Sequence, residues 1–194
     1  LLSDKVYRYN LPFSEKEETE KYLVSVPIKN NREIKIPSGF ISGQNIYNLF
    51  SDLTIGYHDS LDFKKLPIPF ACVASNLVDG QEGIQDCGVL PLAMRASMAI
   101  PGAFAPVRKD GMVLVDGGIS NNFPVDIAKA MGADIIIGVD VQAELKDASG
   151  LESVTGILDQ MTSLLGIQKY EENKKMVNIY IKPDVTPYSA ASFS

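Results

Sequence analysis

The sequence has few features that bind nucleic acid or hold a protein on a membrane. Lysine and arginine number 18 against 24 aspartate and glutamate residues, and the net charge is −6. The cationic residues form no cluster, which argues against a nucleic-acid surface and against docking on anionic lipid. No apolar run approaches the roughly 20 residues that a helix needs to cross a bilayer. We therefore expect no nucleic-acid partner.

Cysteine and histidine are also scarce. Cys72 and Cys87 make no disulfide framework, and no CxxC is paired with histidine as a zinc site requires. We expect Cys72 to be a reduced core thiol and Cys87 to be incidental. The single histidine, His58, is expected to have a surface or packing role. GxGxxG and P-loop motifs are absent, so the usual phosphate cradle is missing and no cofactor is expected.

What the sequence does contain is the pattern of one globular α/β domain. Hydrophobic residues make up 45% of the chain, which is enough for a sizeable core. From residue 68 onward, strand and helix patterns alternate, which predicts a largely parallel sheet with helices on both faces. The predicted strands are 68–75, 112–116, 133–141 and 177–183, and the predicted helices are 89–100, 124–132 and 149–166.

Residues 1–65 form a less regular segment, which we expect to be peripheral to an α/β core of residues 66–194. Residues 14–22 are compatible with a helix, and 22–28 and 32–37 resemble a hairpin. The stretch 42–53 has helical spacing, with Ser42 as its expected cap.

Two of the core elements allow sharper predictions. The unbroken apolar run 133–141 is typical of a strand that is buried on both faces. In the helix 149–166, Ser149 and Glu152 match a capping box. Its expected apolar stripe consists of Leu151, Val154, Ile157, Leu158, Met161, Leu164 and Leu165.

The most informative stretch for function follows the strand 112–116. Asp116 ends this strand, and Gly117 and Gly118 allow a sharp turn and the close approach of another element. Asn121 and Asn122 are expected to hold the loop by hydrogen bonds to local backbone. A carboxylate on a rigid strand end suits a general base, but an aspartate that merely begins a Gly-Gly turn explains the same pattern.

Other polar residues give weaker indications. Asp140 ends the run 133–141, but two strand-end carboxylates without a third ligand do not make a magnesium site, so no metal is expected. Arg95 lies alone in an apolar helix and needs a carboxylate or carbonyl partner. Residues 97–104, which include Pro101, are expected near the Asp116 loop, where they either line an acyl-chain pocket or fill the core.

The stretches RASMAIPGAFAPV and LVDGGISNNFPVDIAKAMGADIIIGVDV resemble the patatin-like phospholipase family, in particular its bacterial branch related to neuropathy target esterase. The resemblance implies a three-layer α/β/α fold and hydrolysis of lipid acyl esters by a Ser-Asp dyad without a cofactor. It makes Asp116 the base, with Gly117, Gly118, Asn121, Asn122 and Pro101 as loop or substrate-site residues. The implied partners are a phospholipid or another acyl ester, with transient contact to a membrane surface.

The chain departs from the family pattern in one respect. The GxSxG elbow and the glycine-rich oxyanion loop, which precede the matched region in the family, are absent. We therefore expect the 194 residues to be the C-terminal part of one catalytic domain, inactive alone and prone to self-association through an uncovered sheet. A non-catalytic binding or scaffold module and an unrelated nucleotide or metal binder are the alternatives. The sequence leaves the compartment open between bacterial cytoplasm and cell envelope.

Overall fold

The computed structural model describes residues 39–57, 59–142, 144–152 and 154–185. The helix and hairpin that we expected within residues 14–37, and His58, lie outside the described residues. Two compact units make up the chain. The first consists of Leu1–Cys72 and Gln85–Asp116, and the second of Val73–Ile84 and Gly117–Ser194.

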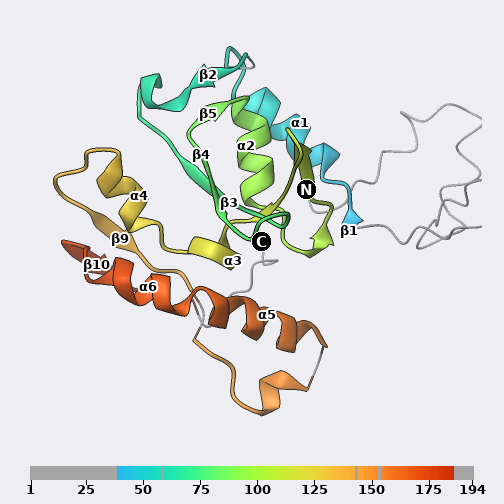
Figure 1. Cartoon of the computed structure of the whole chain (residues 1–194), viewed down its shortest axis with the longest axis vertical. Coiled ribbons are helices and arrows are strands. Elements are labelled where there is room, and N and C mark those ends of the chain that lie inside the picture. Colours follow the sequence, from blue (N-terminus) through green and yellow to red (C-terminus); the bar gives the residue numbers. More distant parts are fainter. Residues whose placement is uncertain (1–38, 58, 143, 153, 186–194) are drawn as a thin grey trace, which may run out of the picture. The chain divides into compact units, whose positions relative to one another are not determined.

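The described part of the first unit combines short strands with two helices. β1 pairs with β6 in parallel, whereas β2 pairs with β5 and β7 with β8 in antiparallel fashion. Figure 1 labels β1, α1, β2, β5 and α2 of this unit. Its elements are β1 (Gly39–Ile41), α1 (Gln44–Leu53), β2 (Leu61–Asp62), the 3-10 turn Phe63–Lys65, β5 (Cys87–Gly88), α2 (Leu90–Ser97), β6 (Gly102–Phe104), β7 (Val107–Lys109) and β8 (Met112–Asp116).

The predicted strand 112–116 is confirmed residue for residue as β8. It forms a hairpin with β7, in which Arg108 lies opposite Val113. Asp110 and Gly111 make the turn with φ angles of 51° and 79°, the backbone that the tightest two-residue hairpins require. The central residues Leu114 and Val115 are buried, so β8 is a firmly held strand up to its last residue, Asp116.

The predicted helices 42–53 and 89–100 are confirmed as α1 and α2, with shorter bounds, and the two helices pack on each other. The expected cap is displaced, because α1 begins after Gly43, whose φ of 80° suits glycine. Ser42 lies one position earlier, and its hydroxyl oxygen accepts a long hydrogen bond, 3.4 Å, from the N–H of Gln44. The core beside α2 is formed by Phe63, Leu90 and Ala93.

The second unit contains β3 (Cys72–Asn76) and β4 (Glu82–Gln85), apart from the end residues Cys72 and Gln85, which count with the first unit. Its buried cluster is Phe123, Val125 and Ile136. Its further elements are α3 (Gly118–Asn121), α4 (Val125–Ala130), β9 (Ile137–Val139), the 3-10 turn Ser149–Leu151, α5 (Val154–Leu165), α6 (Ile167–Lys174) and β10 (Ile179–Ile181).

β9 and β10 run side by side and in parallel, with Ile179 opposite Ile137, and α5 and α6 connect them (Figure 1). The predicted strands 133–141 and 177–183 are thus confirmed, although both are shorter. The prediction that 133–141 is buried on both faces is wrong. Ile137 and Val139 are 60% and 51% exposed, while Ile136 and Asp140 are buried, so only alternate side chains face the core.

The predicted helix 149–166 is confirmed in its C-terminal part, but its capping box is wrong. α5 begins at Val154, and Ser149 lies in a separate 3-10 turn. The hydroxyl of Ser149 donates to Asp147 at 2.7 Å instead of capping the helix. The expected apolar stripe also does not face the core, because Met161 and Leu165 are 55% and 72% exposed.

Parallel and antiparallel strand pairs occur together with helices, which confirms the α/β class. Among the described residues, no helix combines the length and the apolar character that crossing a bilayer requires.

Candidate active site

Asp116 occupies the strand end that the sequence predicted. It is the last residue of β8 and is half-buried. Its N–H donates a hydrogen bond of 3.0 Å to the carbonyl oxygen of Ala99, a fully buried residue just after α2. This bond joins the strand end to the segment 97–104, as expected from the sequence. Pro101 of that segment lies exposed in the turn before β6.

Gly117 follows at once and begins the second unit. Its φ and ψ of −68° and −20° are open to any residue, so backbone freedom is not what requires glycine here. Glycine is required here because there is no room for a side chain. A β-carbon on Gly117 would lie 2.6 Å from the carbonyl carbon of Val73 in β3. The expected close approach therefore occurs, and the partner is the backbone of β3. Gly118 begins the short helix α3.

Asn121 holds the turn, but through side chains of other elements and not through local backbone as we predicted. Its Nδ2 donates to Glu82 at 2.9 Å and to Asp126 at 3.0 Å. Its Oδ1 accepts a bond of 3.1 Å from Nδ2 of Asn173. Asn122, at the C-terminal cap of α3, is exposed. The two asparagines thus differ: Asn121 ties α3 to β4, α4 and α6, and Asn122 faces solvent.

Glu82, Asn121, Asp126, Lys169 and Asn173 form one cluster, which we call the Asn121 network. Lys169 lies 2.7 Å from Asp126 and 3.3 Å from Glu82 and neutralises part of their charge. Burial acts to raise the pKa of Asp126, but the hydrogen bonds from Lys169 and Asn121 outweigh it and lower this pKa. The sequence analysis did not find Glu82, Asp126, Lys169 or Asn173.

A second polar contact fixes the same turn. The hydroxyls of Ser75, buried in β3, and Ser120, in α3, are hydrogen-bonded at 2.8 Å. The sequence analysis missed this pair as well, since the two residues are 45 positions apart and neither belongs to a motif.

Asp140 is fully committed to internal partners, which disfavours the magnesium alternative. Its side chain is completely buried and accepts bonds from Tyr180 at 2.6 Å, Tyr170 at 2.8 Å and Lys182 at 2.9 Å. These three donors all contact Oδ2, and the N–H of Gln142 donates to Oδ1 at 2.9 Å. Among the described residues, no group of three or more His, Cys, Asp or Glu side chains is arranged to hold a metal ion.

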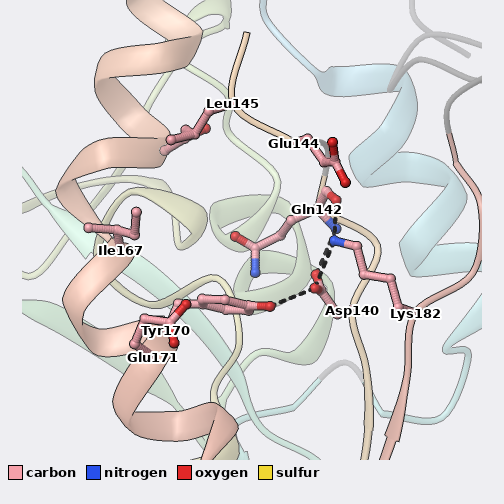
Figure 2. A pocket seen from close by; sticks show the side chains of 9 residues that line it. Asp140, Gln142, Glu144, Leu145, Ile167, Tyr170, Glu171 and Lys182 are labelled. Carbon is pink, nitrogen blue, oxygen red and sulfur yellow. Dashed lines mark hydrogen bonds and ion pairs between the residues drawn. The ribbon is translucent and has the colours of Figure 1, made fainter.

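Figure 2 shows the cavity beside Asp140, which has a volume of about 440 Å³. The residues that line it include the polar Asp140, Gln142, Tyr170 and Lys182 and the apolar Leu145 and Ile167. The side chain of Gln142 lies in the middle of this view (Figure 2). The cavity belongs wholly to the second unit, and none of the predicted site residues lines it.

Replacing Asp140 with Asn should lower the free energy of unfolding by about 2 kcal/mol at pH 7, because hydrogen bonds to a charged group are lost. Burial acts to raise the pKa of Asp140, but the bonds from Tyr180 and Lys182 outweigh it and hold this pKa well below its usual 3.8. The unfolded chain therefore binds the proton first, and the contribution is lost as the pH falls below that value. Urea unfolding between pH 7 and pH 2 measures both effects.

The control for Asp140→Asn is Asp134→Asn. Asp134 is exposed, and its substitution makes the same charge change near the other end of β9. An Asp140→Asn protein that loses stability below pH 4 as steeply as the unchanged protein would contradict the assigned role of this carboxylate.

The remaining sequence predictions have clear outcomes. Arg95 has the carbonyl partners that we expected, since its Nη2 donates to Ser42 at 2.8 Å and to Ala105 at 2.9 Å. Cys72 and Cys87 are both free thiols. Burial raises the pKa of Cys72 to about 11, in keeping with an unreactive core thiol, and Cys87 is exposed.

The chain combines an α/β fold with an Asp-Gly-Gly turn at the end of a strand. Comparison of its sequence with known protein families identifies the class of protein to which it belongs. Residues 11–129 match the family model described as patatin-like phospholipase. Because the match covers more than half of the 194 residues, the chain belongs to the patatin-like phospholipase family. The matched region includes Asp116, both glycines and Pro101.

Several curated proteins are similar to about half of the chain. An uncharacterized NTE family protein of Mycobacterium tuberculosis is 34% identical over 104 residues, which are 54% of this chain and 28% of the relative. Patatin-like phospholipase domain-containing protein 7 of Rattus norvegicus is 33% identical over 106 residues, 54% of this chain and 7% of the relative. Patatin-like phospholipase domain-containing protein 6 of Homo sapiens is 32% identical over 109 residues, which are 55% of this chain and 7% of the relative. The chain thus spans less than a third of each relative's length.

Proposed function

We propose that the chain is part of a lipid acyl hydrolase that cleaves carboxylic esters with a Ser-Asp dyad. Asp116 is the general base in this proposal. Its carboxylate accepts the proton of a serine hydroxyl as the serine oxygen attacks the ester carbonyl, and it returns this proton to the alcohol that leaves as the acyl-enzyme forms. A water molecule, deprotonated in turn, then releases the fatty acid.

The observation that carries the proposal is the placement of Asp116. A general base has to stay within hydrogen-bond reach of the proton that it takes, which requires a carboxylate on a rigid element. Asp116 ends a buried strand, and its own N–H is bound to Ala99. Gly117 directly after it leaves no room for a side chain, so the turn has one closely packed arrangement. Membership in a phospholipase family adds independent support.

The nucleophile in this proposal comes from residues outside the 194. No GxSxG, the motif of the strand-to-helix turn that activates a serine nucleophile, occurs in the sequence. Phospholipids or other lipid acyl esters are the proposed substrates. Removal of one oxyanion donor alone typically costs about 10²–10³ in rate, so the 194 residues without nucleophile and oxyanion loop should be inactive.

Hydrolysis of nitrophenyl esters and of phospholipid vesicles tests the proposal. The natural protein that carries these residues should release nitrophenol and fatty acid, whereas the 194-residue chain, shown to be folded by circular dichroism, should not. Turnover by the 194-residue chain would contradict the assignment of the nucleophile. A folded natural protein that cleaves no ester would instead favour a scaffold module with a degenerate site.

A further inference from the structure

The Asn121 network is more extensive than a turn needs. It joins residues of four elements, β4, α3, α4 and α6, around two asparagine side chains that are almost fully buried. Asn121 and Asn173 are 3% and 1% exposed. A buried amide without partners costs free energy, so such side chains are kept only where their bonds are made.

Asn173 is the centre of this network. It lies near the end of α6, and its Nδ2 faces three acceptors: the carbonyl oxygen of Phe123 at 2.7 Å, Asp126 at 3.0 Å and Asn121 at 3.1 Å. The bond to Phe123 fixes the backbone just after α3, and the bond to Asn121 fixes the last residue of α3. One side chain therefore holds both ends of the three-residue segment 121–123.

Asn121 connects Asn173 to the backbone next to Asp116. Within the turn, the N–H groups of Ser120 and Asn121 both donate to the carbonyl oxygen of Gly117, at 3.1 Å and 2.9 Å. These bonds connect Asn121 directly to Gly117, the residue bonded covalently to Asp116. The Ser75–Ser120 hydroxyl pair and the contact of Gly117 with Val73 hold the other side of the same turn against β3.

The charges of the network favour one arrangement of these bonds. The amide of Asn121 donates to both carboxylates, Glu82 and Asp126, while Lys169 binds the same two groups from α6. An asparagine in the opposite orientation would place its oxygen against two carboxylates, so the donors of Asn121 must face them. Its oxygen then faces Asn173, as is observed.

We infer that Asn121 and Asn173 are positioning residues for Asp116, because they fix the turn from which that carboxylate is presented. The inference rests on the proposed function, in which Asp116 is the base. Neither residue takes part in proton transfer. Their effect is on geometry, and a misplacement of about 1 Å at a reacting group is enough to cost on the order of 10²-fold in rate.

The test uses Asn173→Ala and Asn121→Ala in the natural protein. We expect kcat for ester hydrolysis to fall roughly 10- to 100-fold while KM stays within about twofold, because substrate binding is not altered. Hydrogen exchange at the amides of Ser120 and Asn121 should lose protection in Asn173→Ala. The matched control is Asn178→Ala, which removes an asparagine whose Oδ1 accepts from the N–H of Ile136 at 2.9 Å and which is not part of the Asn121 network. It should leave kcat and both amides unchanged.

Unchanged protection of both amides in Asn173→Ala would overturn the anchoring of the turn. Lost protection with an unchanged kcat would overturn the positioning role, as would an equal fall of kcat in Asn178→Ala. If the natural protein without any substitution cleaves no ester, the proposed function is rejected. The hydrogen-exchange measurement still decides whether Asn173 anchors the turn.

Discussion

Replacing Asp116 with Asn is expected to lower kcat for ester hydrolysis by about 10²–10⁴-fold in the natural protein that carries these residues, the range that loss of a general base produces. Asparagine keeps the size of the side chain and the backbone bond to Ala99, but its amide does not accept the serine proton. KM should change little, because the proton is transferred only in the transition state. Steady-state kinetics with a nitrophenyl ester measure the effect.

Asp110→Asn is the matched control for this substitution. Asp110 lies in the hairpin turn at the opposite end of β8, is exposed, and has a φ of 51°. Asparagine adopts such left-handed backbone as readily as aspartate does. The control therefore makes the same charge change on the same hairpin and should keep full activity. An Asp116→Asn enzyme with the rate of the control would reject Asp116 as the base.

Local sequence signals were sufficient for several elements. The strand 112–116 is bounded by Gly111 and Gly117, and the prediction matches β8 at both ends. α4, which lies within the predicted helix 124–132, begins after Pro124 and ends before Gly132, whose φ is 96°, so proline and glycine mark its two ends. The hairpin partner β7 was missed although Asp110-Gly111, a strong turn signal, directly precedes β8.

The predictions that failed depended on what surrounds an element. An unbroken apolar run such as 133–141 shows that both faces tolerate apolar side chains, but not that anything covers the second face, where Ile137 is exposed. The capping box failed because Asp147 competes for the same turn. Its carboxylate accepts from the N–H of Gly150 and from the hydroxyl of Ser149, which draws Ser149 into a separate turn.

The candidate site was predictable only where it is local in sequence. Asp116 and its glycines stand together in the chain, and the family resemblance identifies them. Asn173 lies 52 positions from its partner Asn121, within the charged stretch KYEENKK, which by composition reads as a solvent-facing helix. Its burial depends on the packing of α6 against α3 and α4, and this information is not contained in the stretch itself.

Replacing Gly117 with Ala is expected to destabilise the chain by about 3 kcal/mol, at the upper end of the cost of overpacking. The added β-carbon would lie 2.6 Å from the carbonyl carbon of Val73. The atoms that it meets include the backbone of a buried strand, so no flexible side chain end can simply move aside. Elsewhere, a Gly→Ala change at this backbone conformation stabilises by roughly 0.4–1 kcal/mol, which makes the sign of the effect informative.

Urea denaturation of Gly117→Ala and of Gly132→Ala separates the steric cause from the backbone cause. Gly132 has a φ of 96°, but a β-carbon there meets nothing within 4 Å, so its substitution should cost about 1–2 kcal/mol through backbone strain alone. Gly117→Ala should cost more although its φ of −68° carries no strain. In the natural protein it should also reduce ester hydrolysis, because the turn after Asp116 has to move away from β3. A Gly117→Ala protein that is as stable as the unchanged chain would mean that the turn does not lie against Val73, and the placement of Asp116 by this contact would then have to be abandoned.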